Sequence, residues 1–105
     1  MRTIDDFKII VVPKARKDMH RIYDYIANVL YNEIAADNLM KKVNKEIERI
    51  KYSPYEYEEI NSYDDFGRKY RRIIIKNYII LYTIDEKYKK IYISNMFYGR
   101  RNYLI

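Results

Sequence analysis

The chain has 105 residues, of which 49% are hydrophobic, 34% are charged and 16% are aromatic. This length and composition predict a single domain, residues 1–105, and argue against intrinsic disorder, because many apolar side chains are available for a core. The sequence has no cysteine, which excludes disulfide frameworks and thiol catalysis, and only two glycines, which excludes glycine-rich phosphate-binding loops. Its net charge at pH 7 is +6.

The first half of the chain is expected to form one strand followed by two helices. Residues Phe7–Val12 are apolar and largely β-branched, which predicts a short buried strand. Apolar residues then recur every three or four positions from Ala15 onward, with a break near Tyr31-Asn32 and an end at Ser53-Pro54. Because the connection between the two helices is short, we expect an antiparallel helical hairpin.

The second half is expected to be rich in β-structure. Residues 55–69 are acidic and polar, which indicates a long surface loop. Three apolar runs with short connections follow, and they predict an antiparallel meander of strands Tyr70–Lys76, Tyr78–Ile84 and Lys90–Tyr98. With the first strand as a fourth member, the fold class is α+β, in the order βααβββ, with an antiparallel sheet packed against the helical hairpin.

Positive charge is concentrated in the last third of the chain. Residues 1–67 carry 11 Lys/Arg and 13 Asp/Glu, a net charge of −2, whereas residues 68–105 carry 10 Lys/Arg and 2 Asp/Glu, a net charge of +8. This asymmetry favours an anionic partner, either a nucleic acid or an acidic protein segment. The candidate target-binding or nucleic-acid-binding residues are Arg68, Lys69, Arg71, Arg72, Arg100 and Arg101.

These basic residues occur beside tyrosines, where the meander begins and where it ends. If the strands bring the two ends together, the residues form one basic and aromatic rim that is suited to hold phosphate and stack on bases. The alternative is that Lys and Arg on an edge strand protect the sheet from aggregation. The single histidine, His20, lies on the polar side of the first predicted helix, where a solvated side chain is expected. No metal-binding or cofactor-binding motif occurs, so we expect neither.

Several segments, in this order and spacing, resemble the RelE/ParE superfamily of type II toxin–antitoxin toxins, and more closely its ParE-like branch. The resemblance spans nearly the whole chain and agrees with the predicted order of helices and strands. It is carried by residues Val12–Asp18, Ile22–Ala27, Ala35–Leu39, Ser53-Pro54, Tyr70–Ile73, Asn77–Tyr82 and Tyr98–Asn102.

The resemblance implies a small cytoplasmic toxin, with no membrane partner, that an acidic cognate antitoxin neutralises within a toxin–antitoxin hetero-oligomer. It leaves two activities open, since RelE-like members cleave mRNA on the ribosome, whereas ParE-like members bind DNA gyrase and perform no chemistry. The nucleases usually carry Arg after the Tyr that begins the second meander strand, where this sequence has Ile79 after Tyr78. We therefore expect a ParE-like toxin that binds gyrase without catalysis.

Two alternative functions remain open. The first is a metal-independent, ribosome-dependent mRNA endonuclease, in which Arg71, Arg72 and Arg101 hold the phosphate and Tyr103 or Lys69 moves the proton. The second is a module that binds its antitoxin and has no remaining toxicity.

Overall fold

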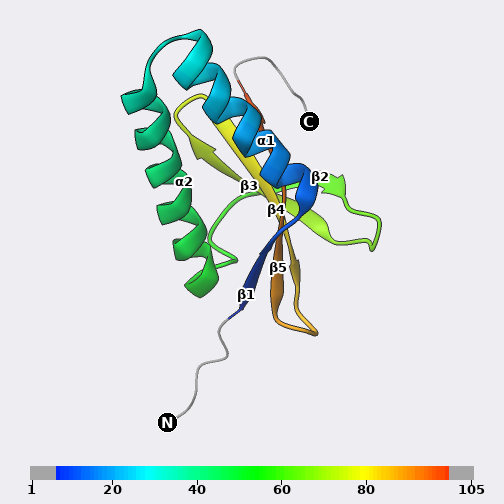
Figure 1. Ribbon diagram of the computed structural model, residues 1–105. Coiled ribbons are helices and arrows are strands. Elements are labelled where there is room, and N and C mark those ends of the chain that lie inside the picture. The colour runs from blue at the N-terminus through cyan, green and yellow to red at the C-terminus, as the bar shows by residue number, and fades with distance from the viewer. Residues whose placement is uncertain (1–6, 100–105) are drawn as a thin grey trace.

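The structure is a computed structural model, and it describes residues 7–99. Within this range, two helices joined by a π-helical turn lie against a five-stranded sheet (Figure 1). The elements in chain order are β1 (Lys8–Val11), α1 (Pro13–Asp24), η1 (Tyr25–Val29), α2 (Glu33–Tyr52), β2 (Glu59–Tyr63), β3 (Lys69–Ile75), β4 (Tyr78–Asp85) and β5 (Lys90–Tyr98). The predicted α+β class is confirmed, and neither described helix is long and apolar enough to cross a bilayer.

The predicted meander is confirmed, but the sheet is mixed rather than wholly antiparallel. The strands lie in the order β1-β5-β4-β3-β2, and β3, β4 and β5 pair antiparallel. The first strand, β1, joins the edge of the sheet by parallel pairing with β5, where Ile9 lies opposite Ile91. The sequence pattern indicated a buried strand, but β1 is only half-buried, because it lies at the edge of the sheet. Its parallel pairing was not predicted, because its partner lies about eighty residues away and local patterning carries no strand direction.

The loop predicted for residues 55–69 was partly wrong, because it contains the edge strand β2. This strand pairs antiparallel with β3, with Glu59 opposite Arg71 and Tyr63 opposite Lys69, and the register is irregular between these pairs. Its side chains alternate between exposed and half-buried. A short strand rich in acidic and polar residues is typical of a sheet edge, and opposite charges across the pair supply stabilisation that its composition lacks.

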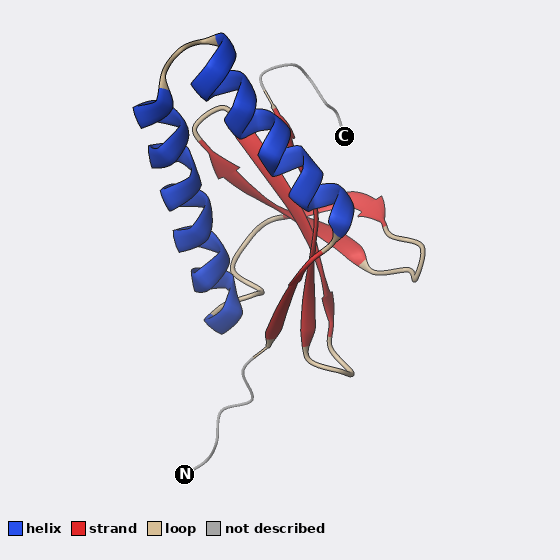
Figure 2. Ribbon diagram, in the orientation of Figure 1, coloured by secondary structure: helices blue, strands red, loops and turns tan. Residues whose placement is uncertain are grey.

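The core lies between the helical hairpin and one face of the sheet (Figure 2). The predicted apolar stripes of both helices supply part of it, and the alternating residues of the three meander strands supply the rest. The buried side chains from the helices include Ala15, Ala36, Leu39, Val43 and Ile50, and those from the meander strands include Ile73, Ile80, Tyr82, Ile91, Ile93 and Met96. Within residues 7–99 no helix covers the opposite face of the sheet, and we call it the open face.

The helix boundaries follow from local chemistry. The break between the helices falls at Tyr31-Asn32, as predicted, where Tyr31 adopts a φ of 53°. The side chain of Asn32 then caps α2 by accepting a hydrogen bond of 3.0 Å from the backbone N–H of Ala35. At the other end, α2 stops before Ser53-Pro54, and the buried hydroxyl of Tyr82 donates to the Pro54 carbonyl at 2.6 Å. This contact fixes the exit of α2 to the sheet.

A buried carboxylate fastens α1 to β5. Asp18 is 1% exposed, and its Oδ2 accepts a hydrogen bond of 3.0 Å from the backbone N–H of Met96. Lys14 and Arg21 donate to the same carboxylate at 2.9 and 2.8 Å. Burial alone would raise the pKa of Asp18, but the hydrogen bonds from Lys14, Met96 and Arg21 outweigh it and hold the pKa below the ordinary 3.8. Asp18 is therefore ionised at neutral pH and anchors the helix.

Candidate functional site

Four of the predicted site residues lie at the start of β3, and all four are engaged in ion pairs within the chain. Their partners are acidic residues of the segment 58–64 and Asp85 at the end of β4. The pairs are Arg68 with Asp64 at 2.8 Å and Asp85 at 3.3 Å, Lys69 with Glu59 at 3.8 Å, Arg71 with Glu59 at 3.0 Å, and Arg72 with Glu58 at 2.8 Å. The acidic residues that made 55–69 look like a solvated loop thus neutralise the neighbouring cations.

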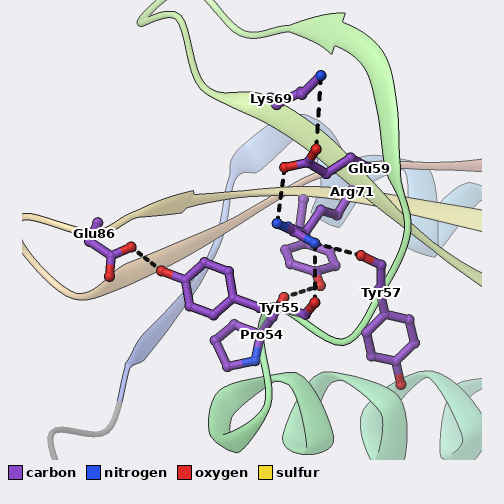
Figure 3. A network of polar contacts seen from close by, with 8 residues as sticks. Pro54, Tyr55, Tyr57, Glu59, Lys69, Arg71 and Glu86 are labelled. Carbon is purple, nitrogen blue, oxygen red and sulfur yellow. Dashed lines mark hydrogen bonds and ion pairs between the residues drawn. The ribbon is translucent and has the colours of Figure 1, made fainter.

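Arg71 is the centre of a network that joins the exit of α2 to the sheet (Figure 3). Its guanidinium donates to the backbone carbonyls of Tyr55 and Tyr57 at 3.2 and 2.7 Å, and to Glu59 at 3.0 Å. The side chain is only 16% exposed, and the guanidinium also stacks on the ring of Tyr55, 5.3 Å from its centroid. These contacts use the donors that would otherwise hold a phosphate.

The tyrosines beside this network are held in the protonated form. Tyr55 donates its hydroxyl hydrogen bond to Glu86, and Tyr57 donates to Glu46. Burial, together with these carboxylate acceptors, raises the pKa of both tyrosines to about 12. Neither hydroxyl is therefore poised to give up a proton near neutral pH.

The start of β3 and the end of β5, next to which the two basic segments occur in the sequence, are not adjacent, so the described residues do not form the expected single rim. The start of β3 pairs with the end of β4, where Arg71 lies opposite Tyr82, whereas the end of β5 pairs with the start of β4, where Tyr98 lies opposite Tyr78. The first and last meander strands run in the same direction, so the start of one and the end of the other lie at opposite ends of the sheet. Arg100, Arg101 and Tyr103 lie outside the described residues.

The position that distinguishes the two branches of the superfamily is built for packing. Ile79 is 3% exposed and lies on the open face of β4. Gly99 approaches it so closely that a Cβ added at Gly99 would lie 2.5 Å from Cδ1 of Ile79. Gly99 also donates a backbone hydrogen bond of 2.7 Å to Asn77 in the β3–β4 turn. The side chain of Ile79 therefore packs against the backbone of Gly99, where a larger residue would collide with it.

None of the site residues predicted from the sequence belongs to the apolar surface at the end of the helical hairpin. The hairpin tip, which we define as residues 25–34, exposes five large apolar side chains by 52% to 88%, namely Tyr25, Val29, Leu30, Tyr31 and Ile34. A groove of about 730 Å³ continues from the tip and is lined in part by Tyr25, Leu30, Tyr78 and Tyr98. Concentrated exposed apolar surface of this kind marks a protein-binding site. The sequence indicates this surface indirectly, because there are more apolar residues around the helix break than one buried face of a helix can cover.

Solved structures of toxin–antitoxin complexes share this fold. The chromosomal ParDE system from P. aeruginosa matches with a TM-score of 0.69 and 15% identity, over 89% of this chain and 96% of that chain. The archaeal RelE–RelB complex from Pyrococcus horikoshii matches with a TM-score of 0.61 and 13% identity, over 91% and 98%. The RelBE2 complex from Mycobacterium tuberculosis matches with a TM-score of 0.52 and 14% identity, over 89% and 98%. The architecture is therefore that of the RelE/ParE-like toxins.

The family of the chain is shown by a match of its sequence to a family model. The family described as the ParE toxin of the type II toxin–antitoxin system parDE matches residues 9–103. This match covers most of the chain, and the chain belongs to that toxin family. No curated protein matches it.

Proposed function

We propose that this member of the ParE toxin family stops growth in the cytoplasm by binding DNA gyrase, without catalysing a reaction, and that an acidic cognate antitoxin neutralises it. The choice of gyrase follows the ParE-like resemblance of the sequence. The choice of binding over catalysis rests on the chemistry of the described residues.

The observation that carries the proposal is the engagement of Arg71. A nuclease that uses no metal needs a free cation to stabilise the charge that develops on phosphorus. Here the guanidinium of Arg71 is directed at two backbone carbonyls and at Glu59. Freeing it for a phosphate would leave these acceptors unpaired, which costs about 1–3 kcal/mol for each buried group.

The surface at the opposite end of the molecule supports a role in protein binding. The hairpin tip and its groove present exposed apolar side chains such as Tyr31 and Ile34, which are 88% and 74% exposed. This surface is suited to the apolar face of an antitoxin segment, and the net charge of +6 favours an acidic one.

The proposal is tested by expressing the protein briefly from a tightly controlled promoter and labelling new DNA and new protein in parallel. We expect DNA synthesis to fall first, while translation continues. Purified protein should also inhibit supercoiling by purified gyrase. If translation falls first, the proposal fails in favour of the mRNA endonuclease, and if growth is unaffected it fails in favour of a non-toxic antitoxin-binding module.

A second assay separates binding from catalysis directly. Purified protein is added to translating ribosomes, and the mRNA is examined for cleavage with the wild-type chain and with Arg101→Ala. We expect no cleavage by either protein. Cleavage by the wild type that is lost in Arg101→Ala, with antitoxin binding retained, would overturn the proposal.

A further inference from the structure

A second hollow, of about 720 Å³, lies on the open face of the sheet, over β3, β4 and β5. Thr83 and Tyr92 lie opposite each other in the β4–β5 register and line it. They alternate along their strands with Tyr82 and Ile93, which are buried beneath the helices. Because neighbouring residues of a strand point to opposite faces, the hollow is on the side that the helices leave uncovered. We call it the open-face hollow.

The open-face hollow is both aromatic and acidic. The aromatic residues that line it are Tyr63, Phe66, Tyr70, Tyr88 and Tyr92. Tyr63, Phe66 and Tyr88 are 57%, 80% and 63% exposed. The charged residues that line it are Asp64, Asp65, Asp85 and Arg68, which leaves a net charge of −2 in a chain whose net charge is +6. The lining is thus negative in a chain that is positive as a whole, which favours a positively charged partner for the hollow.

Arg68 joins the aromatic and acidic residues of the hollow. Its guanidinium lies 4.9 Å from the ring centroids of both Phe66 and Tyr92, and it forms ion pairs with Asp64 and Asp85. Asp64 also accepts hydrogen bonds from the backbone N–H groups of Phe66 and Arg68, both at 2.9 Å. The backbone hydrogen bonds and the ion pair outweigh burial and lower the pKa of Asp64, so this carboxylate stays ionised at neutral pH. Two of the five rings, Phe66 and Tyr92, thus lie against the same guanidinium.

The rings of this region already attract cations from the chain itself. Lys69 lies 5.6 Å from the ring centroid of Tyr63, and Lys87 lies 5.2 Å from that of Tyr88. The electron-rich face of an aromatic ring favours a cation, and a carboxylate excess beside it adds to this attraction. A phosphate would instead meet the carboxylate of Asp65 at the exposed tip of the β2–β3 loop, while Asp64 and Asp85 are already paired with Arg68.

We propose that the open-face hollow is a docking site for a protein segment that presents an arginine or lysine side chain. The proposal rests on the proposed function for the identity of the partner, which is then the target of the toxin. The cation enters between the exposed rings of Phe66 and Tyr88, and Asp65 offers it a carboxylate.

The first test needs no target protein. The full chain, labelled with ¹⁵N, is titrated with acetyl-Gly-Arg-Gly-amide and followed by NMR. We expect shifts confined to residues around the hollow, and no such shifts with the citrulline peptide, which has the same shape without the charge. Tyr88→Ala should weaken binding of the arginine peptide by about two- to fivefold, the worth of one exposed cation–π contact.

Matched variants keep this test falsifiable. Asp65→Asn should weaken binding in the same direction as Tyr88→Ala, whereas Tyr52→Ala should leave it unchanged, because Tyr52 is equally exposed, at 62%, at the end of α2. Equal binding of the citrulline peptide, no detectable binding of the arginine peptide, or shifts at the same tyrosines with a short single-stranded RNA would each overturn the proposal.

A gyrase assay then separates this proposal from the proposed function. The double variant F66A/Y88A should inhibit supercoiling about four- to twenty-five-fold less well than the wild type, while Tyr52→Ala inhibits normally. If the double variant is as potent as the wild type, the hollow is not the docking site although the gyrase function stands. If the wild type does not inhibit gyrase, the proposed function fails, and the peptide titration alone decides whether the hollow binds a cationic segment.

Discussion

The two faces of the sheet differ in what their side chains do. On the face beneath the helices, residues such as Ile73 and Ile80 are 1% and 0% exposed and pack in the core. On the open face, the next residue along β3, Ile74, is 61% exposed, although Ile79, which lies opposite it on β4, is 3% exposed. Burial of apolar area stabilises folding, whereas an exposed face is free to vary for recognition. The difference indicates that the main core of this fold lies on one face, whereas the open face combines exposed side chains with a few packed ones such as Ile79.

The largest effect we expect separates two adjacent isoleucines. Ile73→Ala should lower the free energy of unfolding by about 3–4 kcal/mol, because it leaves a cavity in a packed core. Ile74→Ala should change it by less than about 0.5 kcal/mol, because the side chain is largely in water already. Urea unfolding of both variants measures the difference. Similar losses for the two variants would show that the open face is covered in solution.

A smaller loss is expected when the anchor of α1 is removed. Asp18→Ala leaves the buried N–H of Met96 without its acceptor, and we expect a loss of about 2 kcal/mol. Lys14 and Arg21 are largely exposed and regain water, so they add little. Asp18→Asn keeps an acceptor oxygen for Met96 and should cost less than Asp18→Ala. An equal loss for both variants would mean that charge, rather than the hydrogen bond to Met96, holds the helix.

The same anchor gives a pH dependence with a defined sign. The pKa of Asp18 is lower in the folded chain than the ordinary 3.8, so its contribution to stability is complete above pH 3.8 and is lost as the pH falls through the folded pKa. The stability difference between the wild type and Asp18→Asn should therefore be constant near neutral pH and shrink in acid. Thermal unfolding across this range measures it.

The sequence predicted what depends on local pattern and missed what depends on distant pairing. The helices, their break at Tyr31-Asn32 and the meander follow from periodicity and from turn residues, and all were confirmed. The edge strand β2 was missed because Glu59 and its polar neighbours lack β-propensity and are stabilised by cations on β3. The parallel pairing of β1 was missed because no local signal fixes strand direction.

The candidate site was predicted in composition but not in arrangement. The basic residues at the start of β3 were identified, yet the sequence carries no information on whether Arg71 faces solvent or two backbone carbonyls. The open-face hollow was missed for a similar reason. Most of its residues come from four strands, β2 to β5, and from the loops between them, and Phe66 and Tyr88 are about twenty residues apart, so only the fold brings them to one place.

The smallest effect we expect compares two tyrosines on the two faces. Tyr82 is fully buried, and its hydroxyl donates to the Pro54 carbonyl, so Tyr82→Phe should cost about 1–2 kcal/mol through the unpaired acceptor. Tyr92 lies on the open face and contacts Arg68 through its ring, which phenylalanine retains, so Tyr92→Phe should stay within about 0.5 kcal/mol. Chemical denaturation of the pair is the measurement. A larger loss for Tyr92→Phe than for Tyr82→Phe would reverse the assignment, because the open face would then carry stability that we ascribe to the covered one.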